Sequence, residues 1–554
     1  MRLQLATTVW LMSLILVIGR AQDTSGPKPV GPERDRARES HRGGPLFADA
    51  RDCLACHNNL TTPAGEDVSI GATWRSSMMA NAARDPYWQA TVRRETIDHP
   101  KHDSEIQDEC AACHMPMLHK TVHASGGSAT VFAHLPSARG SDPDLQRLAS
   151  DGVSCTVCHQ MAPEGLGTRD SFNGNFQLRP TQPDGTREIF GPFQVDRGRT
   201  TVMRSVTGFT QAEAPHIAKS ELCASCHTLI TQAFGPNGDV IGSLHEQMNY
   251  QEWQHSAFSR EDRSCQSCHM PKAKGPVRVS SVLGEARDTL ARHVFVGGNA
   301  FMIRLLNRYR AELGVTASPA ELNATADATV RQLQEDTATL HVSSPTLDTG
   351  MLAFDVDVRN LTGHKLPTGY PSRRVWLHIT VTDARGVTVF ESGALADTGA
   401  IQGNDSDRDP LTFEPHYEEI TRPDEVQIYE PILGDRANVP TTGLLTATQY
   451  LKDSRLLPRG FDKKTAPAEV GVFGGAAGDP DFTDAGDRTR YRIPVPASGQ
   501  YTIAAELRYQ SIGYRWAHNL AAYDAPEPKR FVSYYRATSS ASSVIISSAT
   551  ATTR

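Results

Sequence analysis

The chain has 554 residues, a formal net charge of −7 and 21% charged residues, so it is long enough for two or three domains. It carries no strongly basic patch, and this excludes the electrostatic footprint of a nucleic-acid-binding protein.

The chain opens with the pattern of a secretory signal peptide. Arg2 precedes a mostly apolar run from Leu3 to Ile18, and Gly19 and Ala21 are small residues at the two positions that cleavage requires. We expect cleavage after Ala21; an uncleaved membrane anchor is the alternative, although the run is short for a span. The mature protein is then periplasmic or extracellular and has no transmembrane span. Residues 22–45 are polar and rich in Pro and Gly, which predicts a flexible leader.

The next segment contains five copies of the pattern C-x-x-C-H, and these use all ten cysteines. The cysteine pairs are Cys53 and Cys56, Cys110 and Cys113, Cys155 and Cys158, Cys223 and Cys226, and Cys265 and Cys268. The histidines that follow them are His57, His114, His159, His227 and His269.

This spacing suits a covalently attached haem. Two cysteines three residues apart lie on one side of a helical turn, where both sulfurs reach one edge of a porphyrin, and the next histidine points at the iron. A closed zinc site, a thioredoxin-like dithiol and a disulfide framework each fit five such repeats poorly. We therefore expect five covalent haems of the c type, with the five histidines as proximal ligands.

Residues 46–337 are expected to form a mostly helical and loop-rich domain that folds around these haems. At its end, apolar residues at helical spacing predict a helix over 299–315. Ser318-Pro319-Ala320-Glu321 forms a capping-box pattern and predicts a second helix over 319–336.

After residue 338 the hydrophobic period changes to two. Strands are predicted over 351–360 and 501–509, and a hairpin over 373–392 that turns at 383–386. Such strands without intervening helices indicate an antiparallel β-sandwich-like domain over 338–537. The low-complexity tail, 538–554, is expected to be frayed. The fold class is thus α+β multidomain, with a haem-packed domain followed by a β domain.

Each haem iron has a second face that another ligand can close. The candidates for this distal role are His119, His123, His216, His293 and Met79, and further histidines near the motifs are His99, His102, His134, His245 and His255. Met78 offers a second thioether beside Met79. His364 lies in a Gly- and Pro-containing loop; it can reach a haem or shape the loop, and the sequence favours the second reading.

The acidic stretch 403–410 carries Asp405, Asp407 and Asp409 at alternate positions. Oxygen ligands at this density can hold calcium, although Pro410 and His416 stand where an EF-hand needs Gly and Glu. A different calcium loop therefore stays open beside a solvated acidic turn.

Several stretches resemble the multihaem cytochromes c of the cytochrome c-554 and c-prime family. They are CLACHNN with WRSSMMANAARDPYW, DGVSCTVCHQM, YQEWQHSAF with CQSCHMP, and HVFVGGN. The C-terminal part resembles the β domain of some exported multihaem cytochromes through NLTGHKLPTGYPSRRVWL and LKDSRLLPRGF. The resemblance implies low-spin haems, mostly with two histidine ligands, packed as an electron wire. Members often have W-x-x-S-x-H after a motif, and here Met79 stands at that histidine's place.

Three functions follow as hypotheses. The leading one is an exported electron carrier that serves redox partner proteins, such as other cytochromes or quinol-linked complexes. The second is a multihaem oxidoreductase acting on nitrite, hydroxylamine or a sulfur oxyanion at one open haem, although no C-x-x-C-K variant is present. The third is a subunit of an extracellular cytochrome filament, in which a residue such as His41 reaches a neighbouring subunit's iron.

Overall fold

A computed structural model describes residues 45–138 and 140–553. The expected signal peptide and all but the last residue of the expected leader lie outside the described residues. Within them, no helix has both the length and the apolar character needed to cross a membrane.

The segment that carries the motifs consists of short helices, as the sequence predicts, and of three small strand pairs, which the sequence analysis does not predict. The helices are α2 (Ala50–Leu54), α3 (Ile70–Trp74), α4 (Pro86–Asp98), α5 (Asp103–His114), α6 (Pro116–Ala124), α7 (Pro143–Ser150), α8 (Cys155–Cys158), α9 (Arg197–Thr207), α10 (Ser220–His227), α11 (Asn249–Gln254), α12 (Ala257–Arg260) and α13 (Cys265–His269). The strand pairs are β1 (Arg187–Gly191) with β2 (Phe209–Glu213), β3 (Thr228–Phe234) with β4 (Val240–Met248), and β5 (Val277–Arg278) with β6 (Ala286–Arg287).

Local sequence sets where these helices begin. Pro86 is the first residue of α4, and the Asp85 side chain accepts hydrogen bonds from the backbone N–H groups of Tyr87 and Trp88. An aspartate cap followed by proline satisfies amides that have no partner inside the helix. The same pairing of Asp and Pro starts α7, where Asp142 is the cap.

Two helices link the motif segment to the strands. The helix predicted over 299–315 is shorter, α14 (Ala300–Arg308), and ends in turns. The second is α15 (Pro319–Glu335), and both hydrogen bonds of the predicted capping box between Ser318 and Glu321 are present.

The remainder is dominated by strands, which form two five-stranded sheets and one three-stranded sheet. One large sheet has the order β11-β10-β18-β19, with β13 beside β10; the other has the order β12-β17-β9-β7, with β8 beside β9. The three-stranded sheet has the order β15-β14-β16. The bounds are β7 (Ala338–Val342), β8 (Thr346–Asp348), β9 (Met351–Asn360), β10 (Arg374–Asp383), β11 (Thr388–Ser392), β12 (Glu419–Ile420), β13 (Ile428–Tyr429), β14 (Pro431–Gly434), β15 (Pro440–Thr441), β16 (Gln449–Asp453), β17 (Asp487–Pro494), β18 (Tyr501–Gln510) and β19 (Ser543–Thr552).

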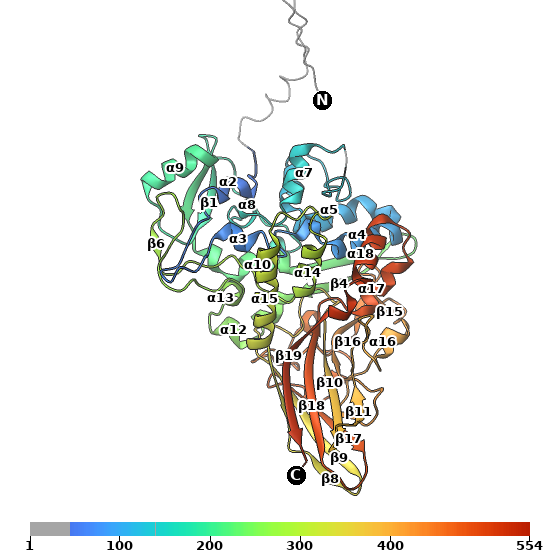
Figure 1. Ribbon diagram of the computed structural model, residues 1–554. Coiled ribbons are helices and arrows are strands. Elements are labelled where there is room, and N and C mark those ends of the chain that lie inside the picture. Colours follow the sequence, from blue (N-terminus) through green and yellow to red (C-terminus); the bar gives the residue numbers. More distant parts are fainter. Residues whose placement is uncertain (1–44, 139, 554) are drawn as a thin grey trace, which may run out of the picture. The chain divides into compact units, whose positions relative to one another are not determined.

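The two large sheets share one core (Figure 1). The alternate residues Leu352, Phe354, Val356 and Val358 of β9 meet inward residues of β10 and β18 in a single buried cluster. Burial along β9 therefore alternates with the period of two that the sequence predicts. All pairings in these sheets are antiparallel except the short one between β12 and β17.

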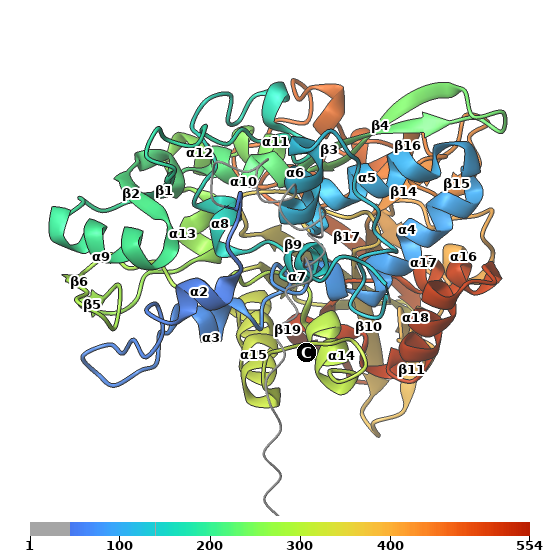
Figure 2. The ribbon, with the colours of Figure 1, turned by 90° about the horizontal axis from the view of Figure 1, so that it is seen from above.

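The structure corrects two expectations, the frayed tail and the absence of helices between the late strands, and it adds one contact. The tail expected to be frayed forms β19, which pairs along β18, and its β-branched Val, Ile and Thr residues favour a strand. Three helices lie between the late strands: α16 (Asp405–Arg408), α17 (Tyr514–Asn519) and α18 (Pro526–Arg536). Helix α18 packs against α4, which lies in the motif segment (Figure 2). The domain boundary at 337/338 stays a prediction.

Candidate haem attachment sites

The five C-x-x-C-H motifs lie in or at the ends of five helices, α2, α5, α8, α10 and α13. All ten cysteines are among the described residues, and none forms a disulfide. Two clusters of potential metal ligands exist in the described part of the chain, and neither contains a cysteine. The structure therefore favours neither the disulfide nor the zinc alternative.

The same kind of hydrogen bond orients four of the five motif histidines. Nδ1 of His57 lies 2.7 Å from the carbonyl oxygen of Val279, and Nδ1 of His159 lies 2.6 Å from that of Phe190. His114 and His269 make the same contact, with the carbonyls of Ala82 and Val296. A carbonyl only accepts, so Nδ1 carries the proton and Nε2 keeps its lone pair for a metal. This donor set fits a haem iron.

Burial keeps several of these rings neutral. It lowers the pKa of His114 and of His227 to about 4, and it also lowers the pKa of His159. A neutral imidazole is the form that binds metal. The His114 ring also stacks on Trp88, with centroids 4.4 Å apart and planes 5° from parallel, which fixes its orientation.

Two of the motif histidines face a second histidine. The rings of His159 and His293 have centroids 6.2 Å apart and planes 19° from parallel. Those of His269 and His364 have centroids 6.3 Å apart and planes 14° from parallel.

This spacing is that of two imidazoles bound to one iron. With metal–nitrogen bonds of about 2 Å, rings bound through Nε2 on opposite sides have centroids roughly 6 Å apart. The partner histidines have the matching tautomer, because Nδ1 of His293 donates to the carbonyl of Ala291 and Nδ1 of His364 to that of Lys365. The geometry thus brings His293, predicted as a distal ligand, opposite the third motif. It also brings His364, for which the sequence favours a loop-shaping role, opposite the fifth.

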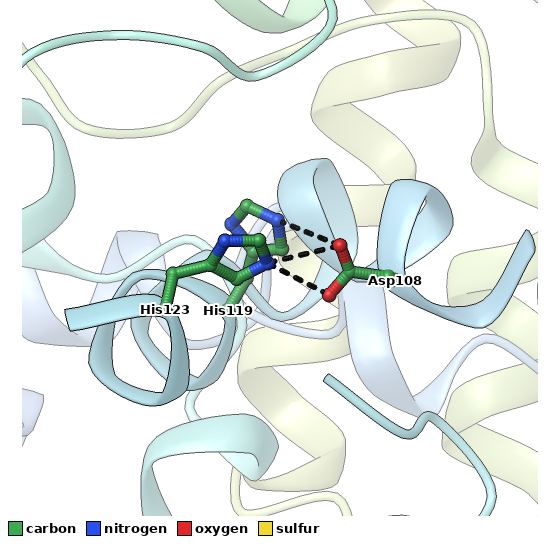
Figure 3. A group of neighbouring side chains, drawn as sticks. All are labelled: Asp108, His119 and His123. Carbon is green, nitrogen blue, oxygen red and sulfur yellow. Dashed lines mark hydrogen bonds and ion pairs between the residues drawn. The ribbon is translucent and has the colours of Figure 1, made fainter. Parts of the chain in front are cut away.

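His119 and His123 lie together on α6 and turn toward one carboxylate (Figure 3). Nε2 of His123 is 2.9 Å from both oxygens of Asp108, and Nε2 of His119 is 3.6 Å from one of them. Nδ1 of His119 is buried without a hydrogen-bond partner, and burial lowers the pKa of this residue to about 4. Their distal role stays a prediction.

The other predicted distal ligands have different surroundings. Nε2 of His216 donates to the carbonyl of Met161 at 2.8 Å, so only Nδ1 remains free. Met79 packs in the apolar cluster that contains Val157 and Cys158 of the third motif. Its distal role at the first motif also stays a prediction. His134 and His255 each donate Nδ1–H to the backbone carbonyl four residues earlier, so their Nε2 is left available for a metal, as in four of the motif histidines.

Side chains from different motifs are close neighbours. Cys53 of the first motif interacts with Cys155 of the third, and helices α2 and α8 are in contact. Cys226 of the fourth interacts with Cys113 of the second, and Cys223 of the fourth with Cys265 of the fifth. The third and fourth motifs are linked through Cys158 and Cys226. The motifs therefore form one continuous group.

Two of the three aspartates in the acidic stretch 403–410 form ion pairs with arginines. Both oxygens of Asp407 bind the Arg374 guanidinium, at 2.9 and 2.8 Å, and Asp405 pairs with Arg408. An oxygen of Asp409 accepts the backbone N–H of Leu411. These contacts do not support calcium in this stretch.

Comparison with known proteins gives one match. No protein-family model and no curated protein matches the chain. Among solved structures, a penta-heme cytochrome c552 from Thermochromatium tepidum matches with 17% sequence identity and a TM-score of 0.49, over 92% of this chain and 98% of that one. This similarity is too weak to assign a fold or a function.

Proposed function

We propose that this protein is an exported pentahaem c-type cytochrome that passes electrons along covalently bound haems. The observation that carries the proposal is the set of five motifs, each with two cysteines free of disulfides and a histidine, four of which have Nδ1 hydrogen-bonded to a carbonyl and Nε2 available. Five repeats of one attachment chemistry in one chain fit a relay better than a single reaction centre.

The residues have distinct parts in this function. The ten cysteines would tether the haems, and the five proximal histidines would bind the irons, each of which supplies a one-electron redox centre when bound. The backbone carbonyls that accept from Nδ1 hold the rings in place and raise the basicity of Nε2. All ten motif cysteines are half-buried, and the surrounding protein would set each reduction potential through the iron ligands and the local polarity.

The contacts between motifs support a relay and suggest its order. Cysteine side chains of the first and third motifs interact, as do those of the fourth with both the second and the fifth, and Cys158 of the third is near enough to Cys226 of the fourth for their charges to interact. His57 is likewise close enough to His159 for their charges to interact, as is His227 to His114 and to His269. Because transfer between haems requires short separations, the fourth motif is the proposed branch point.

The proposal extends to the setting of the protein. The N-terminal pattern supports export to the periplasm or cell surface, where redox proteins such as other cytochromes or quinol-linked complexes would exchange electrons with it. The resemblance to the cytochrome c-554 and c-prime family supports the same role. The strands after residue 338 would form a β-sandwich-like domain for docking or scaffolding.

The test is a haem count together with a spectrum of the exported protein. We expect intact mass and pyridine haemochrome absorbance to give five haems per chain, bound through thioethers. We further expect a mainly low-spin spectrum that added nitrite or hydroxylamine leaves unchanged. A chain without porphyrin mass would refute the proposal. A high-spin band that shifts with either compound would instead indicate the oxidoreductase.

A further inference from the structure

We propose that His364, from the strand-rich half of the chain, is the distal ligand of the iron held by His269, and that a cluster of four buried charges positions it. The proposal rests on the proposed function, since it requires a haem at the fifth motif. It makes the strand-rich half part of the redox machinery rather than only a docking surface.

The first observation is the ring geometry. His364 and His269 have centroids 6.3 Å apart and planes 14° from parallel, which agrees within 0.1 Å with the His159 and His293 pair at 6.2 Å. The two pairs come from unrelated segments, so the agreement reflects a common requirement. His364 is half-buried, and its Nδ1–H donates to the carbonyl of Lys365 at 2.9 Å, which leaves Nε2 for a metal.

The second observation is how firmly the loop is held around His364. The carbonyl of His364 accepts from the Asn360 side-chain amide at 2.8 Å and from the Thr362 hydroxyl at 2.9 Å. Leu366 and Leu456 exchange two backbone hydrogen bonds, each of 2.9 Å. A Cβ at Gly363 would meet the Phe258 ring of α12 at 3.0 Å, so only glycine lets the loop lie this close to the motif segment.

The third observation is a cluster of four buried charges beneath this loop, hereafter the four-charge cluster: Glu252, Lys365, Asp453 and Arg455. Glu252 lies on α11 in the motif segment, and its two oxygens bind the strand-rich half directly.

 
One oxygen of Glu252 accepts the backbone N–H of Lys365 at 3.1 Å, and the other accepts from the Arg455 guanidinium at 2.8 Å. Glu252 therefore joins the two halves of the chain through a hydrogen bond next to His364 and an ion pair with Arg455.

The four-charge cluster is closed and neutral. Lys365 Nζ is 2.7 Å from Asp453, and Arg455 binds both oxygens of Asp453 at 2.9 and 2.7 Å. The side chains of Lys365, Asp453 and Glu252 are no more than 2% exposed, and that of Arg455 is 8% exposed. Two cations and two carboxylates at this depth are stable only together, because removing one leaves its partner buried and unpaired. The cluster therefore fixes the loop against α11, on which Glu252 lies.

The test uses the full-length, haem-loaded protein. In His364→Gly we expect the haem count to stay at five while one of the five irons changes from low spin to high spin, as seen by magnetic circular dichroism and electron paramagnetic resonance. Added imidazole should restore the low-spin signal. His341→Ala, at an exposed histidine on β7, is the matched control and should leave the spectrum unchanged.

A second variant tests the positioning role. Lys365→Met removes one cation from the four-charge cluster but leaves His364 in place. We expect one iron of the ferrous variant to bind carbon monoxide, whereas no iron of the parent protein does. The reason is that carbon monoxide displaces a histidine that is held less firmly. The conservative Lys365→Arg should bind less carbon monoxide than Lys365→Met.

The outcomes separate the two proposals. A parent protein without haem refutes the proposed function itself. Five haems with an unchanged spin state in His364→Gly overturn the ligand assignment alone. If His364→Gly behaves as expected but Lys365→Met binds no additional carbon monoxide, the positioning role of the cluster is wrong. Protection from protease across residues 338–553 shows whether each variant has folded.

Discussion

The most direct prediction concerns His293, the residue opposite the third motif. Replacing it with alanine removes the ring whose centroid lies 6.2 Å from that of His159. Alanine ends at Cβ, so no atom of the new side chain takes the place of Nε2. The third iron keeps one protein ligand, and a fifth of the haem iron should become high spin while the haem count stays at five.

The assay compares low-temperature electron paramagnetic resonance of the oxidised parent and variant at equal haem concentration. His293→Met is the informative companion, because a thioether can restore a low-spin iron while raising its reduction potential. A low-spin spectrum that is identical in the parent and in His293→Ala would refute the inference that two rings at this spacing bind the same iron. It would weaken the assignment of His364 by the same reasoning.

Three further predictions follow. His216→Ala should leave the spin state unchanged, because Nε2, the atom through which the paired histidines would bind iron, already donates to a backbone carbonyl in His216; a new high-spin signal would indicate ligation through its free Nδ1 instead. Asp407→Ala leaves the Arg374 guanidinium, which is 4% exposed, buried without its partner, and should lower the free energy of unfolding by about 3–5 kcal/mol in denaturant titrations, whereas Asp357→Ala at an exposed pair should have little effect. Burial raises the pKa of Glu246 to about 8, so the folded protein keeps a proton that the unfolded chain releases above pH 4.5, and stability falls as pH rises through this range. Glu246→Gln should therefore raise the melting temperature at pH 8 but not at pH 4, and equal shifts at both would contradict the assignment.

Local patterns predict the elements well where they alone decide the structure. The capping box at Ser318 and Glu321 starts α15 at Pro319, and the alternation over 351–360 gives β9 with the predicted bounds. The predicted hairpin turn separates β10 from β11. In these cases the deciding interactions lie within a few residues of each other, so sequence spacing is sufficient.

The tail and the acidic stretch show where local patterns fail. Low complexity at 538–554 suggested fraying, but a strand partner in β18 supplies hydrogen bonds that no local pattern reveals. The aspartates of 403–410 left a calcium loop open beside a solvated acidic turn, whereas in the structure Arg374 from β10 pairs with Asp407. Both outcomes depend on partners that are distant in sequence.

The sequence by itself determined the proposed attachment chemistry, because C-x-x-C-H places two sulfurs and an imidazole together within five consecutive residues. Only the tertiary structure decided which histidine faces which motif. His293 is 134 positions from His159 in the chain and His364 is 95 from His269, and such pairs meet only through the packing of the whole chain. The proposed proximal ligands are positioned by a local helical turn, whereas the proposed distal ligands are positioned only by tertiary packing.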